Sequence, residues 1–212
     1  MTWRLTGFCL ALTFSGACAS GPPVEGPPAV PPAAEESPAA GDEFKAAGIF
    51  AVSRHEGMVK ALLGLDAHTR RWADFVGFRE NRETAVQTAV REFTEETRGA
   101  YEAAVTIERL AAASDRLHRV GAVRIFLLEV PFKEADLLAG LPGSDHAEKT
   151  HYCWVDLRVL LESADNSTGE TSVPPECDGP GVDGRLQVRD VTAANLRRGG
   201  VLREPLDGIA SQ

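Results

Sequence analysis

Three glutamates within residues 77–99 have the type and the spacing of ligands for a divalent cation. Glu92, Glu95 and Glu96 stand at i, i+3 and i+4, so a helix over 83–97 places their carboxylates on one face. Carboxylates one turn apart repel each other, and a cluster of three needs a compensating cation. Mg²⁺ and Mn²⁺ bind carboxylate oxygens and keep positions open for the oxygens of a phosphate chain. The spacing therefore predicts a Mg²⁺ or Mn²⁺ site on this helix.

The other side of the same predicted helix is apolar. Its hydrophobic residues recur at helical spacing, and we expect this face to pack on a β-sheet. The apolar residues are Ala85, Val86, Ala89, Val90 and Phe93. The alternative is a solvated acidic surface helix without a metal, but the lysine that such helices usually carry four residues after a glutamate is missing here.

The segment 77–99 resembles the Nudix box of pyrophosphate-cleaving hydrolases. The pattern is Gly, five residues, Glu, seven residues, Arg-Glu, an apolar residue, any residue and Glu-Glu, carried here by Gly77, Glu83, Arg91, Glu92, Phe93, Glu95 and Glu96. The family usually has glycine two places after the last glutamate, where this chain has Arg98 followed by Gly99. This departure touches no ligand position. It bears on the helix exit, where we expect Gly99 to take the left-handed conformation one position late.

The resemblance implies a metal-dependent hydrolase that cleaves the pyrophosphate bond of a nucleoside diphosphate-linked or related small phosphorylated substrate. The implied metal ligands are Glu92, Glu95, Glu96 and the carbonyl of Gly77. Either Glu95 or Glu96 would take the proton of the attacking water, and the box alone does not decide between them. Arg91 and Glu83 would orient the cluster through charge-assisted hydrogen bonds.

Four further residues are candidates for the same site. Arg79 and Arg82 lie in the loop of the box and could bind a terminal phosphate, although loop arginines are as often solvated. Glu148 is a candidate auxiliary base or metal ligand, and His151 is a candidate substrate contact. A solvated loop glutamate and a hydrogen-bonded strand histidine are the ordinary alternatives for these two.

Two other classes of function stay open. A Nudix-like module that binds nucleotides without turnover would typically lack one or more of the carboxylates that are intact here. In a structural lipoprotein with an acidic helix, nothing would explain why Arg91 and Glu83 occur at the spacing of the Nudix box. The net charge of −9 over 212 residues argues against a nucleic-acid binder, because a polyanion needs a basic surface.

Residues 1–19 have the pattern of an export signal, with Arg4 before an apolar run and small residues at 15–19. Two processing routes fit: cleavage after residues 17–19, or lipoprotein cleavage before Cys18 followed by its acylation. We therefore expect a periplasmic protein or one tethered to a membrane through lipidated Cys18. The alternative is a cytoplasmic protein whose true start lies downstream.

Residues 20–43 are rich in proline and alanine and predict an extended linker, so the hydrolase domain is expected over 44–212. In an exported protein Cys153 and Cys177 could form a disulfide, and in the cytoplasm they would be ordinary thiols. The sequence assigns no oligomeric state.

The fold expected from the order of elements is an α/β domain, and the resemblance implies a Nudix-like α/β/α sandwich with a mixed β-sheet. We expect the box helix on one face and the later helices on the other, with Trp72 and Phe75 in the core. Predicted strands cover 46–52, 58–65, 72–78, 120–130 and 148–157, the first two as a hairpin and 120–130 as a central strand. Predicted helices cover 104–113, 132–139, 157–163 and 187–198, with a long loop over 164–184.

Overall fold

The computed structural model describes residues 43–142, 148–166, 171–173, 185–198, 200 and 202. All of them belong to one compact unit, 38–212. The predicted signal, Cys18, Cys177 and the predicted linker up to residue 42 lie outside the described residues. Across the part of the chain that is described, no helix has the length and apolar character needed to span a membrane.

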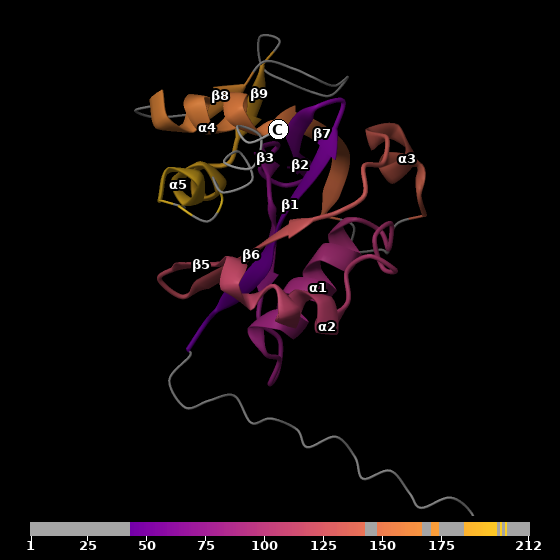
Figure 1. The fold of residues 1–212 in the computed structure, drawn as a ribbon, viewed down its shortest axis with the longest axis vertical. Helices are drawn as coiled ribbons and strands as arrows, with labels where there is room; N and C mark the ends of the chain where they lie inside the picture. Colours follow the sequence, from indigo (N-terminus) through magenta and orange to yellow (C-terminus); the bar gives the residue numbers. More distant parts are fainter. Residues whose placement is uncertain are drawn as a thin grey trace, which may run out of the picture. The chain divides into compact units, whose positions relative to one another are not determined.

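A mixed sheet of nine strands forms the centre of the domain (Figure 1). Its strands follow the order β5-β6-β1-β2-β3-β9-β8, while β4 pairs with β1 and β7 pairs with β2. The pairs β1–β6 and β3–β9 are parallel, and the other pairs are antiparallel. The strands are β1 (Ala46–His55), β2 (Met58–Asp66), β3 (Trp72–Ala73), β4 (Phe75–Phe78), β5 (Leu117–Val120), β6 (Val123–Glu129), β7 (Lys149–Asp156), β8 (Thr171–Val173) and β9 (Leu186–Val188).

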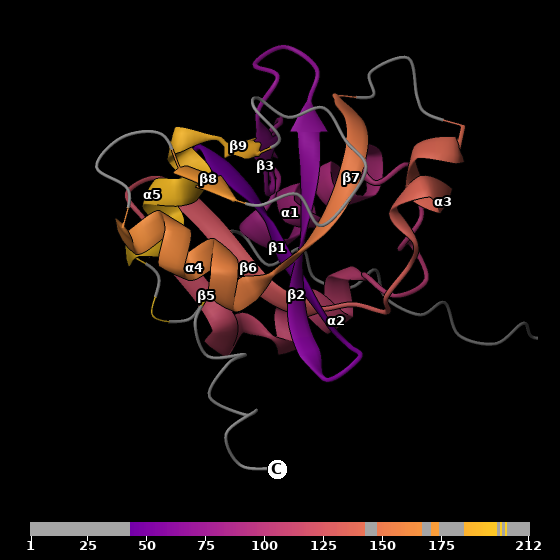
Figure 2. The same cartoon turned by 90° about the horizontal axis from the view of Figure 1, so that it is seen from above.

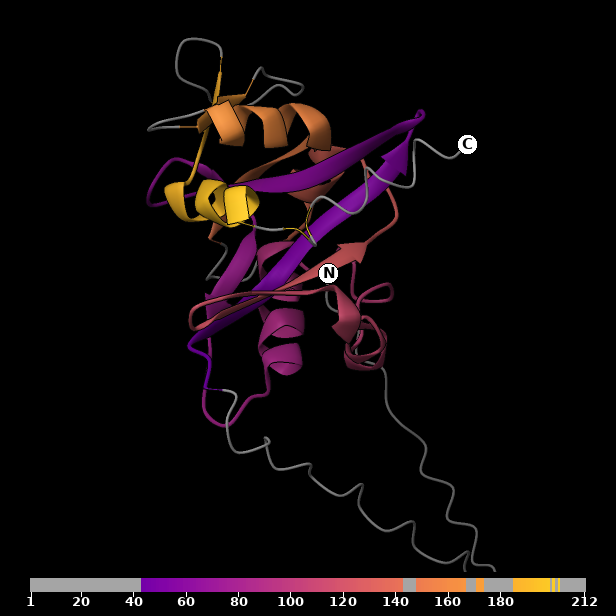
Figure 3. The same cartoon turned by 60° about the vertical axis from the view of Figure 1, so that its left-hand side comes forward.

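Helices cover both faces of this sheet, as Figures 2 and 3 show. The helices are α1 (Ala85–Glu96), α2 (Ile107–Ala112), α3 (Ala135–Gly140), α4 (Leu157–Asn166) and α5 (Asp190–Arg198), with a 3-10 turn at Ser114–Arg116. One core cluster joins the sheet to α4 and α5 through residues such as Leu160 and Leu196. A second cluster joins the opposite face to α1, α2 and α3 through Phe93, Leu110 and Leu138. The expected α/β sandwich with a mixed sheet is confirmed.

Several predicted elements are confirmed with small shifts of their ends. The hairpin of β1 and β2 closes between His55 and Met58, and its turn residues Glu56 and Gly57 both have positive φ, as a tight two-residue turn requires. Trp72 and Phe75 are fully buried, on opposite faces of the sheet. The late strand and the box helix also form where expected.

Other predictions were wrong in their boundaries. Residues 120–130 are not one strand, because Gly121 takes a left-handed φ and turns β5 into β6. Residues 72–78 divide at buried Asp74, after which the chain leaves β2 and pairs with β1. The expected loop over 164–184 contains the end of α4 and strand β8, and the expected last helix begins with β9.

The placement of the later helices was also partly wrong. Only α4 and α5 pack on the face opposite the box helix, whereas α2 and α3 share its face. The connections explain this arrangement, because α2 follows α1 after a short turn at 97–106 and packs against it. The face of the sheet that carries α1 is therefore covered by three helices.

The stability of the sheet should depend on Gly48, because a side chain there would meet the backbone of β4. A Cβ at this position would lie 1.9 Å from the carbonyl oxygen of Phe75. We expect Gly48→Ala to lower the free energy of unfolding by about 3 kcal/mol or more, measured by urea denaturation. Gly140→Ala is the control, since a Cβ there meets nothing within 4 Å and alanine favours helix by about 1 kcal/mol. Equal stabilities of the two variants would contradict the packing argument.

Candidate active site

Helix α1 is fixed at its start by a capping box and along its length by core packing. The Thr84 hydroxyl accepts a hydrogen bond from the Gln87 backbone N–H at 3.3 Å, and the Gln87 side-chain oxygen accepts one from the Thr84 N–H at 2.8 Å. Phe93 is fully buried and contacts the ring of Phe75 edge-on, with ring centroids 5.1 Å apart. The apolar face of the helix therefore packs against the sheet. This packing fixes the rotation of the helix about its axis and with it the direction of the acidic face.

Two successive left-handed residues end this helix. Arg98 has φ 55° and Gly99 has φ 73°, so Gly99 is left-handed as expected. The exit is not one position late, however, because Arg98 directly follows the cap residue Thr97 and already takes the left-handed conformation where the family has glycine. The guanidinium of Arg98 compensates by donating to the carbonyls of Ala139, Leu141 and Lys149, at 2.9, 2.8 and 3.3 Å. Arg98 therefore joins the helix exit to α3 and to the start of β7.

Arg91 is the hydrogen-bonding centre of the site. Its Nε and Nη2 donate to the two carboxylate oxygens of Glu83 at 2.8 and 3.1 Å, a bidentate pair. Its Nη1 donates to Glu92 at 2.9 Å and to Glu95 at 3.2 Å. Its Nη2 also donates to the carbonyl of Phe78 at 2.8 Å, which joins the helix to β4. The orienting role that the resemblance implies for Arg91 and Glu83 agrees with these contacts.

Glu83 is itself braced from three sides. Its Oε2 accepts from the Thr88 hydroxyl at 2.9 Å and from the Glu80 N–H at 3.0 Å, in addition to Arg91. These hydrogen bonds favour the ionised form and lower the pKa of Glu83, with Arg91 the largest cause. Glu83 is therefore an anion whose orientation and charge are both fixed by the fold.

Gly77 leaves the space that the Glu92 carboxylate occupies. A Cβ on Gly77 would lie 1.9 Å from the carboxyl carbon of Glu92, so any larger residue would displace that carboxylate. Glu92 is half-buried, and burial raises its pKa while the charge of Arg91 opposes this shift. The motif therefore needs glycine at position 77 for a steric reason, since any side chain there would collide with Glu92.

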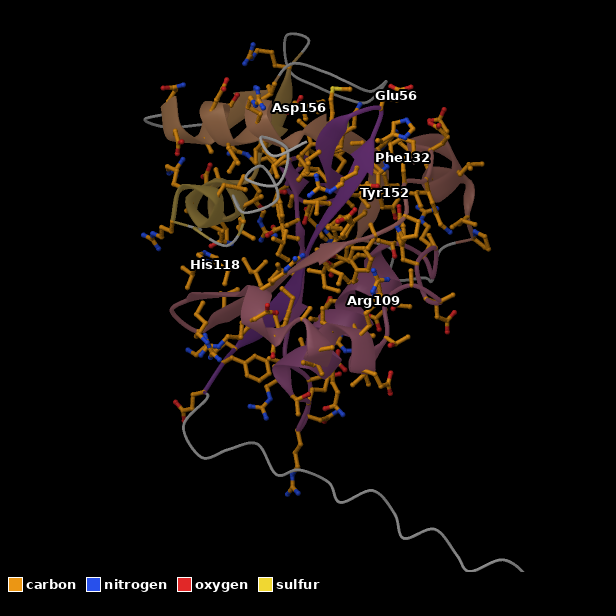
Figure 4. The ribbon with its side chains drawn as sticks, viewed as in Figure 1. Glu56, Arg109, His118, Phe132, Tyr152 and Asp156 are labelled. Carbon is orange, nitrogen blue, oxygen red and sulfur yellow. The ribbon has the colours of Figure 1, made fainter. Side chains whose placement is uncertain are left out.

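Glu96 is the most deeply buried of the three clustered glutamates, with 4% of its surface exposed. Its Oε1 lies 3.0 Å from the ammonium of Lys149. The hydroxyl of Tyr152, a residue of β7 that Figure 4 labels, donates to the backbone carbonyl of Glu96 at 2.5 Å. Oε2 of Glu96 is buried without a hydrogen-bond partner in the described part of the molecule. Burial raises the pKa of Glu96 to about 8, an effect that Lys149 opposes and that the charges of Glu92 and Glu148 reinforce.

The remaining candidates are placed differently from one another. Glu148 lies near the cluster, since its charge raises the pKa of both Glu92 and Glu96. The Arg79 guanidinium lies over the ring of Phe44, 4.8 Å from its centroid, and Arg82 is exposed. His151 contacts the Thr150 hydroxyl at 3.1 Å. Substrate contacts by the last three residues stay predictions.

Lys149 contacts the cluster directly and was not predicted from the sequence. A usable signal was present in Gly64, a glycine in the interior of an apolar strand, which often marks a close approach by another group. A Cβ on Gly64 would lie 2.8 Å from both Cγ and Cδ of Lys149. The glycine makes room for the aliphatic stem of this lysine.

The carboxylate oxygens of this cluster are ligands that suit Mg²⁺ or Mn²⁺. In this structure the same carboxylates are instead paired with Arg91 and Lys149. No three His, Cys, Asp or Glu side chains among the described residues converge to hold a metal ion. Glu92 and Glu95 instead bond to Arg91, and Glu96 bonds to Lys149. Carboxylate oxygens, the space cleared by Gly77 and the unpartnered Oε2 of Glu96 are features that a hard divalent cation uses.

No protein-family model matches the sequence, and no curated protein matches it. The structure is similar to that of a C. elegans Ap4A hydrolase in a binary complex, with 18% identity and a TM-score of 0.45 over 80% of this chain and 99% of that chain. It is similar to RenU, a Nudix hydrolase from M. smegmatis, with 17% identity and a TM-score of 0.43 over 79% and 88% of the two chains. It is also similar to the Nudix domain of Shewanella oneidensis NrtR complexed with ADP ribose, with 14% identity and a TM-score of 0.37 over 57% and 77%. Similarity at these identities concerns the fold alone.

The raised pKa of Glu96 predicts a pH-dependent cost to stability in the absence of metal. The folded protein holds a proton on Glu96 that the unfolded chain releases near pH 4.5, so stability contributed by this group is lost as pH rises from about 4.5 to about 8. The Glu96→Gln variant lacks this titration. Its stability relative to the wild type should therefore increase with pH, by at most about 1.4 kcal/mol per pH unit. Urea denaturation in EDTA between pH 5 and pH 8.5 gives the slope, and a difference that does not change with pH would contradict the assignment.

Proposed function

We propose that this protein is a metal-dependent hydrolase that cleaves the pyrophosphate bond of a nucleoside diphosphate-linked or related small phosphorylated substrate. The observation that carries the proposal is the hydrogen-bonding of Arg91, which contacts Glu83, Glu92 and Glu95 at once. A solvated acidic helix has no need of such a centre, since exposed ion pairs contribute little to stability. A site that must keep several carboxylates fixed at close range does need one.

In this proposal the metal is held by Glu92, Glu95 and Oε2 of Glu96, with the carbonyl of Gly77 as a further ligand. When bound, Mg²⁺ or Mn²⁺ supplies positive charge to the diphosphate and lowers the pKa of a coordinated water. Arg91 and Glu83 keep the carboxylates in position through their paired hydrogen bonds. The charge of Glu148, in the loop before β7, contributes to the raised pKa of both Glu92 and Glu96, which makes it a candidate for a further carboxylate.

Two residues are placed to take the proton of the attacking water. Glu95 is exposed, with 53% of its side chain accessible, so solvent and substrate can reach it. Glu96 has a pKa of about 8, which suits proton transfer near neutral pH, but its carboxylate is buried. Glu95 has the accessibility that a general base needs, and Glu96 has the suitable pKa. Both residues therefore remain candidates for the general base.

A second candidate function is a module that binds a nucleotide without turnover. The observation that favours it is the buried ion pair of Glu96 with Lys149, which engages one of the three carboxylates without any metal. The two functions differ in a simple measurement. A module would bind a nucleoside diphosphate compound and release no product from it, with or without Mg²⁺.

The hydrolase proposal is tested by product mass after incubation with a panel of nucleoside diphosphate compounds, with and without Mg²⁺. We expect Glu92→Gln to lower the rate by roughly two to three orders of magnitude, because it removes a metal ligand and leaves the hydrogen bond to Arg91 available. Glu102→Gln is the matched control, since this exposed glutamate follows the box helix outside the cluster. Equal rates in Glu92→Gln and wild type at saturating Mg²⁺ would contradict the metal site. Binding without turnover in the wild type would favour the module.

We also propose that the protein is exported and tethered to a membrane through lipidated Cys18. The support within the described residues is Cys153, which is buried and disulfide-bonded. Disulfides persist mainly in oxidising compartments. The pairing with Cys177 stays a prediction, because that residue lies outside the described segments.

Fractionation of the producing bacteria tests the tether. The full-length protein should sediment with membranes, whereas Cys18→Ala should remove the acylated residue and release the protein from them. Cys9→Ala is the matched control, since Cys9 lies in the part of the signal that either cleavage removes. A full-length protein that stays soluble and keeps its N-terminal methionine would show that the signal is not used.

A further inference from the structure

Lys149 is a buried cation in a space built for it. Only 1% of its surface is exposed, and its ammonium lies 3.0 Å from Oε1 of Glu96. Its stem lies against Gly64, at a point where the pairing of β2 with β7 changes register between Gly64 and Asp66. The Arg98 guanidinium donates to its backbone carbonyl at 3.3 Å. Burying a lysine this deeply is costly unless its charge is compensated.

The compensation comes from more than one carboxylate. Glu96 contacts the ammonium directly. Burial opposes a net lowering of the pKa of Asp66 that comes from the hydrogen bonds of Thr69 and, to a lesser extent, from the charge of Lys149. Burial raises the pKa of Asp74, and the charge of Lys149 is one of the effects that oppose this shift. Asp74 is buried, with one oxygen bonded to the Thr192 hydroxyl at 2.6 Å and the other without a partner in the described structure. The ammonium thus contacts Glu96, which belongs to the proposed metal site, and acts on Asp66 and Asp74 only through its charge.

We propose that Lys149 is a built-in cation of the site, which occupies the place of one divalent ion at Glu96 and leaves only Oε2 of this carboxylate to a metal. The inference rests on the proposed function, since it concerns how the same carboxylates are neutralised. The geometry behind it is an ammonium fixed on Oε1 beside a buried Oε2 with no partner. A divalent ion that used both oxygens would lie against this ammonium, and the two cations would repel each other.

Lys149 acts in this proposal as a positioning residue, because it acts through Glu96 and not on a substrate. A purely structural ion pair would affect stability and leave the number of bound metal ions unchanged. A built-in cation has an additional consequence: when it is removed, the carboxylates that it neutralised become available to a divalent ion. The number of ions bound per chain therefore separates the two roles.

The test is a Mn²⁺ titration of the full chain at pH 8.5, with free Mn²⁺ followed by electron paramagnetic resonance and no substrate present. We expect Lys149→Met to bind one more Mn²⁺ ion per chain than the wild type. Its melting temperature should fall in EDTA and should rise more steeply with Mg²⁺ than that of the wild type, because metal then replaces the lost charge. Lys149→Gln is the second variant if Lys149→Met does not fold, since its amide can still donate to Oε1, and the same gain of one ion is expected.

Lys133→Met is the matched control. The Lys133 ammonium donates to the carbonyl of Ala100 at 2.6 Å and lies over the ring of Tyr101, so its loss should leave the number of bound ions unchanged. Equal numbers of bound Mn²⁺ in the wild type and the Lys149 variants would overturn the inference. A wild type that binds no Mn²⁺ beside a Lys149 variant that binds one would support it and contradict the metal-dependent hydrolase. The absence of Mn²⁺ from every protein would overturn both.

Discussion

The neutralisation of negative charge on one face of α1 is the constraint on which the rest of the site depends. Three carboxylates within five residues repel one another, and burial raises the cost of ionising two of them. Two cations neutralise these carboxylates. Arg91 pairs with Glu95 at the exposed edge, and buried Lys149 pairs with Glu96 within the core. Without these two cations the helix could not bring its acidic face so close to the sheet.

Backbone features of the fold follow from placing those cations and carboxylates. Gly77 and Gly64 each leave a space that a charged side chain fills, Glu92 in one case and Lys149 in the other. Arg98 takes a left-handed conformation that is unfavourable for a side chain, and its guanidinium in turn satisfies three carbonyls, including that of Lys149. Close packing of the backbone against charged side chains thus helps to position the site.

The two cations have different consequences for chemistry. Arg91 is partly exposed and forms its hydrogen bonds in a fork, so it fixes directions and still leaves outer oxygens of Glu92 and Glu95 accessible. Lys149 is enclosed, and its ammonium lies 3.0 Å from Oε1 of Glu96. Such a site would hold a metal at its open edge, where Arg91 orients Glu92 and Glu95, while Lys149 neutralises the inner carboxylate of Glu96. This division of roles is specific to the pairing of Glu96 with β7 and is not visible in the box motif.

The sequence by itself determined the box helix, its acidic and apolar faces, the hairpin and the α/β class, because each depends on local periodicity or on turn chemistry. It also placed Glu92, Glu95 and Glu96 on one face, since a helix fixes which residues share a face. Glu83, however, precedes α1, and its pairing with Arg91 was implied only by the family resemblance. Only the tertiary structure decided that Lys149 reaches Glu96, that α2 and α3 join α1 on one face, and that Gly121 divides β5 from β6. These depend on contacts between segments far apart in the chain or on a turn that competes with strand propensity, and neither leaves a periodic signal in the sequence.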